Sequence, residues 1–275
     1  MLGVVLGTAL RIGANSYLNV FQKLLTNTGS KSSVINFYTY LGLSFCALLL
    51  IPLYSFSCVS ELALNFVIMG FLGALGNYFI IKALSLGELS ALAPINSYKP
   101  VVAMIIAFLY LGEIPSLESV FGIFMIILGT YILSFKGTFS DKKAVLYRVL
   151  ALIFSGSEAV FIKKIILLTN LPTSFALWAF SGLIFSLFFM LISKNKPKLP
   201  KINHLLALIL FVALMQYSTN YVFSKINVSY ALALFQLSTV LSVFLGVKIF
   251  KEQGLIRKII ASTIMVIGAV IILIT

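Results

Sequence analysis

The sequence is poor in charged side chains, and acidic ones are the scarcest. Only 10% of the 275 residues are charged and only 7 are aspartate or glutamate, whereas a typical soluble domain has about 25% charged residues. The 2 cysteines, Cys46 and Cys58, lie in or beside an apolar run without the spacing of metal ligands. These shortages exclude a water-soluble domain, and we expect neither a metal ion nor a cofactor.

The motifs of enzyme chemistry are missing as well. The chain contains no nucleophile elbow, no His/Glu zinc pattern and no phosphate-binding loop. Its net charge of +13 comes from lysines and arginines in the breaks between apolar runs, where basic side chains meet lipid headgroups. We therefore expect the protein not to be an enzyme and not to bind nucleic acid, and we expect the lipid bilayer as its partner.

Long apolar runs dominate what is present. The chain is 61% hydrophobic with a mean hydropathy of +1.11, and its apolar runs have the length of about 20 residues that a membrane-spanning helix needs. They do not alternate polar with apolar residues as transmembrane strands do. The expected spans are 2–22, 33–56, 62–82, 89–111, 117–135, 144–166, 171–193, 203–224, 229–250 and 255–274. The sequence predicts an all-α polytopic membrane protein of ten transmembrane helices.

An internal repeat organises these spans. The stretch Ser90–Glu113 returns as Tyr230–Glu252, with Ala-Leu-Ala near the start and glutamate at the end of both copies, and Asn77 returns as Asn220. A fixed period of this kind indicates duplication of one structural unit. The expected division is 1–136 for the first repeat, 137–143 for the connecting loop and 144–275 for the second repeat. Because each repeat has five spans, the second copy enters the bilayer from the opposite side, which makes two inverted repeats.

The distribution of basic residues predicts an orientation. Most of the 20 lysines and arginines, with Arg148 among them, lie at connections that follow odd-numbered spans. Under the positive-inside rule these connections face the cytoplasm, and both termini lie on the outside.

Three ionisable side chains lie deep within spans. Arg11 is in the first span, Lys99 in the fourth and Glu158 in the sixth, and Glu158 is the one carboxylate away from span ends and connections. An ionisable group at this depth costs several kcal/mol unless it is paired or hydrated, so it is a candidate for function. The alternative is a structural ion pair that fixes two helices.

Polar side chains on other spans complete the candidate site. Arg11, Asn15, Asn19 and Gln22 recur at helical spacing on one face of the first span, and Pro94 and Pro100 make the fourth span irregular. Helix–helix hydrogen bonding and a kink without function are the alternatives. The predicted substrate-binding residues are Arg11, Asn15, Asn19, Asn77, Asn96, Tyr98, Lys99, Glu158, Gln216, Asn220, Gln236 and Thr239.

Small residues mark the last span of each repeat. Gly122 and Gly129 in the fifth span correspond to Ala261 and Gly268 in the tenth, and each pair lies seven residues apart on one helix face. Small residues allow close helix packing, so we interpret these spans as a scaffold or as a homodimer contact. Trp178, in the seventh span, is interpreted as an interfacial side chain.

The residues described so far resemble the drug/metabolite transporter superfamily, in particular its ten-span EamA-type members. The resemblance depends on motifs whose order and repetition span nearly the whole chain. These are Ile12-Gly13-Ala14-Asn15 with Lys23, the second copy Ser155-Gly156-Ser157 with Lys163-Lys164, Ala83-Leu84 followed by Ala91-Leu92-Ala93-Pro94, and Leu111-Gly112-Glu113 echoed by Lys251-Glu252. The family has tryptophan where this chain has Ile12, and its members commonly keep both termini in the cytoplasm.

The resemblance implies a carrier in a bacterial cytoplasmic (inner) membrane, with a central cavity lined by spans 1, 3, 4, 6, 8 and 9. Together with the buried charges, it predicts a secondary transporter that moves an amino acid or a related zwitterion by alternating access. Arg11 and Lys99 would meet a substrate carboxylate, and Glu158 would meet an ammonium group or a coupling proton. The alternatives are a flippase of a lipid-linked group and a non-transporting membrane scaffold subunit.

Overall fold

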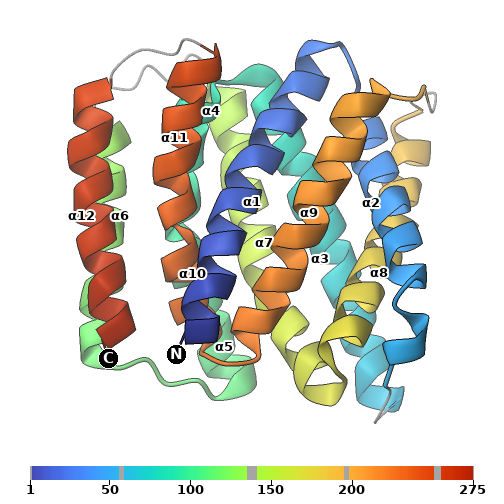
Figure 1. The fold of residues 1–275 in the computed structure, drawn as a ribbon, viewed down its shortest axis with the longest axis horizontal. Helices are drawn as coiled ribbons and strands as arrows, with labels where there is room; N and C mark the ends of the chain where they lie inside the picture. Colours follow the sequence, from blue (N-terminus) through green and yellow to red (C-terminus); the bar gives the residue numbers. More distant parts are fainter. Residues whose placement is uncertain (1, 56–58, 135–140, 195–197, 251–254, 275) are drawn as a thin grey trace.

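The computed structural model describes residues 2–55, 59–134, 141–194, 198–250 and 255–274. Every regular element in these ranges is a helix (Figure 1). The elements are α1 (Leu2–Asn27), α2 (Ser32–Leu48), η1 (Ile51–Leu53), α3 (Val59–Leu86), α4 (Leu89–Leu92), η2 (Ala93–Tyr98), α5 (Lys99–Leu111), α6 (Leu117–Ser134), α7 (Lys142–Leu168), α8 (Leu171–Ile192), α9 (Ile202–Phe223), α10 (Val228–Phe235), α11 (Leu237–Phe250) and α12 (Leu255–Ile274).

These helices confirm the prediction of an all-α polytopic membrane protein. Within the described residues, four helices are long and apolar enough to cross a membrane, and shorter apolar helices accompany them. The long ones are Glu61–Leu86, Lys142–Leu168, Leu171–Ile192 and Ile202–Phe223. Large apolar side chains such as Phe45, Leu109 and Phe188 are exposed on the outside of the bundle, where lipid would cover them.

The two halves pack as inverted copies. Helices α1 to α6 form the first repeat and α7 to α12 the second, with α4, η2 and α5 as one span and α10 with α11 as its counterpart. Contacts between the repeats come in exchanged pairs: α1 packs on α9 while α3 packs on α7, and α5 packs on α7 while α11 packs on α1. Such exchange is expected of inverted repeats related by a pseudo-two-fold axis in the membrane plane. The predicted loop 137–143 falls mostly outside the described residues.

The fourth span is broken in both repeats. In the first, Pro94 and Pro100 lie in the first turns of η2 and α5, where a missing N–H removes no helical hydrogen bond. In the second, α10 ends at Phe235 and α11 begins at Leu237 without any proline. The Gln236 side chain donates to the Leu232 carbonyl there, at 2.7 Å. The sequence predicted an irregular helix in the first repeat alone.

Small residues bring α6 and α12 together at one edge of the bundle (Figure 1). A Cβ atom added to Gly129 would lie 2.7 Å from the Ala261 carbonyl oxygen, and one added to Gly268 would lie 2.5 Å from that of Gly122. The glycines therefore pack the last helices of the two repeats against each other within one chain. A homodimer through α6 and α12 stays a prediction, and it would use their outer surfaces.

Candidate functional site

A cavity of about 100 Å³ lies between the repeats. Its walls come from α1, α2, α3, η2 and α5 of the first repeat and from α7, α8, α9 and α10 of the second. The predicted residues that line it are Arg11, Asn15, Asn19, Asn77, Asn96, Lys99, Glu158 and Gln216. Their role in substrate binding stays a prediction. Helices α2 and α8, which the family resemblance did not include, also contribute to the wall.

Arg11 lies on the buried face of α1, with 6% of its surface exposed. Its Nε donates a 3.3 Å hydrogen bond to the Thr219 hydroxyl, and its guanidinium lies 4.7 Å from the centre of the Phe235 ring. Its Nη1 is buried and has no hydrogen-bond partner within the described residues. A buried guanidinium nitrogen without an acceptor is costly, so Arg11 has capacity for an anionic group.

Lys99 is the first residue of α5, directly after the break in the fourth span. Its side chain lines the cavity, and it interacts electrostatically with Glu158, Arg11 and Arg148. The part of the chain that the structure describes provides Lys99 with no hydrogen bond and no ion pair. The break between η2 and α5 therefore places an unpaired ammonium group at the cavity wall.

Glu158 occupies a space that α3 leaves open. The residue is 8% exposed, and a side chain at Gly73 would collide with its carboxylate. The Trp178 Nε1 donates a 2.6 Å hydrogen bond to Glu158 Oε1, and Tyr40 packs on the indole with ring centres 5.1 Å apart. The interpretation of Trp178 as an interfacial side chain was wrong, because its indole is 5% exposed and lies in the cavity wall.

Arg148 is the charged residue of the cavity wall that is absent from the predicted site. It was counted among the basic residues of the connections, yet it is 6% exposed and lines the cavity. Its Nε donates a 3.1 Å hydrogen bond to the Leu92 carbonyl at the end of α4. Its position one turn inside the predicted sixth span was the available signal, since a charge that far inside a span needs a polar environment.

The ionisable groups of the cavity are not paired with one another. Within the described residues there are two ion pairs, Glu113 with Lys163 and Glu61 with Lys164. Neither of these pairs includes Arg11, Lys99, Arg148 or Glu158. The alternative of a structural ion pair between these helices therefore finds no support.

An amide network holds Asn77 at the wall. The Gln22 side-chain nitrogen donates to Asn77 Oδ1 at 3.0 Å, and the Asn77 nitrogen donates to Asn36 Oδ1 at 2.5 Å. The Asn36 nitrogen donates in turn to the Ala74 carbonyl at 3.0 Å. The polar face of α1 thus meets α3 at this point through Gln22, which makes the helix–helix hydrogen bond that was the alternative for this face.

Other predicted site residues lie beside the cavity and not in its wall. Asn220 accepts a 2.8 Å hydrogen bond from Gln216, which does line the cavity, and donates to the Ser174 hydroxyl at 3.0 Å, which joins α9 to α8. Gln236 accepts a hydrogen bond from Asn96 at 3.2 Å. Asn220 and Gln236 thus make hydrogen bonds between helices, and their role in substrate binding stays a prediction. Tyr98 is half-buried outside the lining, and the side chain of Thr239 lies outside the described residues.

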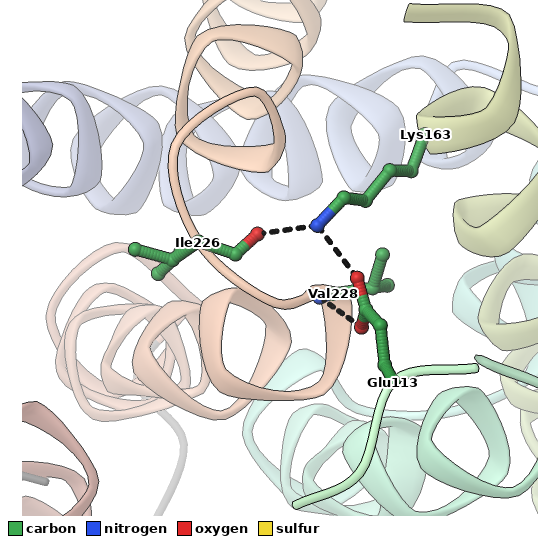
Figure 2. A network of polar contacts seen from close by, with 4 residues as sticks. All are labelled: Glu113, Lys163, Ile226 and Val228. Carbon is green, nitrogen blue, oxygen red and sulfur yellow. Dashed lines mark hydrogen bonds and ion pairs between the residues drawn. The ribbon is translucent and has the colours of Figure 1, made fainter. Parts of the chain in front are cut away.

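A second polar cluster joins the repeats at the end of the bundle where both termini lie (Figure 1). Glu113 Oε1 lies 2.6 Å from Lys163 Nζ, and Glu113 Oε2 accepts a 2.9 Å hydrogen bond from the Val228 backbone N–H (Figure 2). Lys163 also donates to the Ile226 carbonyl at 2.9 Å. We call Glu113, Lys163, Ile226 and Val228 the repeat clasp, because Glu113 follows α5 of one repeat and the other three belong to the second.

The first repeat contains part of the same arrangement. Lys23, near the end of α1, donates to the Leu84 carbonyl in the last turn of α3 at 2.8 Å and to the Gly87 carbonyl between α3 and α4 at 2.5 Å. Lys163 of α7 has the equivalent bond to Ile226 between α9 and α10. The counterpart of Glu113 is Glu252, which lies outside the described residues.

Comparison with known proteins gives one family and one fold. The model of the EamA-like transporter family matches residues 2–135 and again residues 142–274. Among solved structures, 29 chains match. One, described as "Crystal structure of protein", has a TM-score of 0.72 and 15% identity, and covers 98% of this chain and 95% of its own. At that identity the likeness shows the fold alone. The comparison with curated proteins gives no match.

Proposed function

The chain belongs to the EamA-like transporter family, and we propose that it is a secondary transporter that moves a small carboxylate-bearing solute by alternating access. An amino acid or related zwitterion, as expected from the sequence, belongs to this class of solute. The site is the cavity between the repeats. The membrane we propose is a bacterial cytoplasmic membrane.

The observation that carries this proposal is the set of unpaired charges at the cavity wall. Arg11 and Lys99 come from the first repeat, Arg148 and Glu158 from the second, and all four line one cavity. A non-transporting scaffold would pair such groups, because each buried charge without a partner costs several kcal/mol. Unpaired charges of both signs around an open volume are suited to a polar solute, with Glu158 available for an ammonium group or a coupling proton.

Alternating access requires contacts between the repeats that open and close. The repeat clasp is a contact of this kind, since one ion pair and one hydrogen bond, both made by Glu113, join the two halves at one end of the bundle. Inverted repeats in transporters rock about a site near the membrane midplane. A clasp at one end and a cavity between the halves support this mechanism.

The flippase alternative is less well supported. An apolar groove of about 640 Å³ runs along α1, α2, α8 and α9, and its lining includes Leu10, Leu49 and Tyr217. It shares no lining residue with the cavity. The groove therefore does not supply the lateral entrance that a lipid-linked headgroup would need.

Flux into proteoliposomes tests the proposal, with radiolabelled alanine and aspartate as probes. We expect saturable uptake by the wild-type protein and at least tenfold slower uptake by Arg11→Ala and Glu158→Gln. Lys198→Met, which removes an exposed charge from the connection between α8 and α9, is the control and should transport normally. Unchanged flux in both cavity variants would exclude these residues from the mechanism.

A further inference from the structure

The charges around the cavity do not balance. Arg11, Lys99 and Arg148 are cationic and Glu158 is the one carboxylate among the lining residues, which leaves a formal excess of two positive charges. The sequence, in which Arg148 was read as a connection residue, predicted two cations and one anion. The added arginine changes the solute that fits.

The neighbours of these groups do not cancel the excess. Arg11 donates a hydrogen bond to the Thr219 hydroxyl, and Arg148 donates one to the Leu92 carbonyl. Both acceptors are neutral. Lys99 interacts electrostatically with the two arginines and with Glu158, so the four groups form one cluster. Arg11 Nη1 is buried and finds no acceptor among the residues that the structure describes, which leaves a donor for a ligand oxygen.

The broken fourth span adds to the positive potential. Asn96 and Lys99 both line the cavity, and α5 begins at Lys99 and continues for 13 residues. The N-terminus of a helix carries a partial positive charge. At the start of α5 this charge adds to that of the Lys99 side chain, while the Lys99 backbone N–H itself donates to the Asn96 carbonyl. In transporters the N-termini of broken helices commonly point at anionic groups of the substrate.

The size of the cavity limits the solute. At about 15–30 Å³ for each water-sized group, the cavity of about 100 Å³ has room for roughly three to seven such groups. A dicarboxylate with a short carbon chain is of this size. A neutral amino acid is of similar size but brings no net charge, so it would leave the excess in place.

We propose that the cavity selects small dicarboxylates over neutral amino acids, an inference that rests on the proposed transport function. Two carboxylates neutralise the excess charge of Arg11, Lys99 and Arg148 over Glu158, and the guanidinium groups offer the paired donors that carboxylates accept. Solutes should therefore rank by net negative charge: dicarboxylate, then acidic amino acid, then neutral amino acid.

Thermal-shift titrations of the purified protein test the ranking, with malonate, aspartate and alanine as probes. Ligand stabilisation depends on concentration relative to the dissociation constant, so apparent constants can be compared. We expect malonate to bind at least tenfold more tightly than alanine, with aspartate between them. Equal or tighter binding of alanine, or no stabilisation by any of the three, would overturn the inference.

Variants separate cavity charge from overall charge. Arg148→Met should weaken the binding of malonate at least tenfold and the binding of alanine less. Arg148→Lys keeps the charge, so malonate should still bind more tightly than aspartate and alanine. Lys164→Met removes the same charge from a residue outside the cavity lining that is paired with Glu61, and it should change neither constant. A loss of malonate binding in Lys164→Met as large as that in Arg148→Met would refute a role for the local excess.

Glu158→Gln discriminates between the two substrate classes. Removal of the carboxylate should strengthen malonate binding, whereas a site that uses Glu158 for an ammonium group would lose affinity for alanine and gain none for malonate. Proteoliposome flux separates the two levels of the proposal. Saturable alanine uptake that malonate does not inhibit overturns the dicarboxylate inference alone, and malonate binding without flux of any probe overturns the transport function.

Discussion

Asn96 donates a 3.2 Å hydrogen bond to Gln236, and the two residues are separated by 140 positions, the offset that relates the two repeats. Each lies at the break in the fourth span of its repeat. Counterparts that contact each other must lie close to the pseudo-two-fold axis. The axis therefore passes between the two interrupted helices, beside the cavity that Asn96 helps to line.

Removal of Asn96 alone should lower the free energy of unfolding more than removal of Asn96 and Gln236 together. Gln236 is 1% exposed, so Asn96→Leu leaves its Oε1 without a donor at a cost of about 1–3 kcal/mol. The double variant Asn96→Leu/Gln236→Leu removes both groups and should recover part of that loss. Thermal unfolding in detergent compares the stability of the wild type, Asn96→Leu, Gln236→Leu and the double variant. Thr263→Ala, on the exposed face of α12, is the control. Additive losses in the double variant would show that the contact contributes nothing.

The repeat clasp should open and close during transport. A reversible cross-link between cysteines at positions 113 and 163, in a background without Cys46 and Cys58, should abolish flux, and reduction should restore it. The matched control is a cross-link between positions 65 and 110. The Tyr110 hydroxyl donates a 2.9 Å hydrogen bond to Asn65, and both residues belong to the first repeat. A cross-link between these positions should therefore leave flux intact. Normal flux through the protein cross-linked at 113 and 163 would mean that this end stays closed.

The helical architecture could be predicted from the sequence because a lipid environment restricts the backbone conformations that a chain can adopt. A backbone without water must satisfy its own hydrogen bonds, so each long apolar run becomes a helix. The recurrence of Asn77 as Asn220 and of Glu113 as Glu252 then fixes two units. The polar face of α1 was also predictable, since helical spacing alone decides which side chains share a face.

The site was less predictable. The sequence shows how far a residue lies from the end of its span, but not whether its side chain faces the cavity, another helix or the lipid. Arg148 and Trp178 lie toward the ends of their predicted spans, where basic and aromatic residues usually meet the membrane surface. Both instead face the cavity, which depends on how α7 and α8 are rotated against their neighbours. The break at Gln236 had no proline to mark it.

Gly73 should be essential because it makes room for Glu158. Gly73→Ala places a methyl group against the carboxylate and should displace it from the Trp178 N–H. The chain has 1 tryptophan, so the change in indole environment should appear directly in its fluorescence. Gly13→Ala is the control, since nothing lies within 4 Å of its added Cβ. An unchanged emission spectrum in Gly73→Ala would contradict the packing.

The basic connections predict the orientation of the chain in the membrane. Positions 114 and 198 are exposed at opposite ends of the bundle, after α5 and after α8. Under the positive-inside rule, position 198 lies with the basic connections in the cytoplasm and position 114 lies outside with both termini. A membrane-impermeant thiol reagent applied to intact cells should label Ile114→Cys and not Lys198→Cys, in the background without Cys46 and Cys58. The reverse pattern would place the termini and the repeat clasp on the cytoplasmic side, so solute entering past the clasp would come from the cytoplasm.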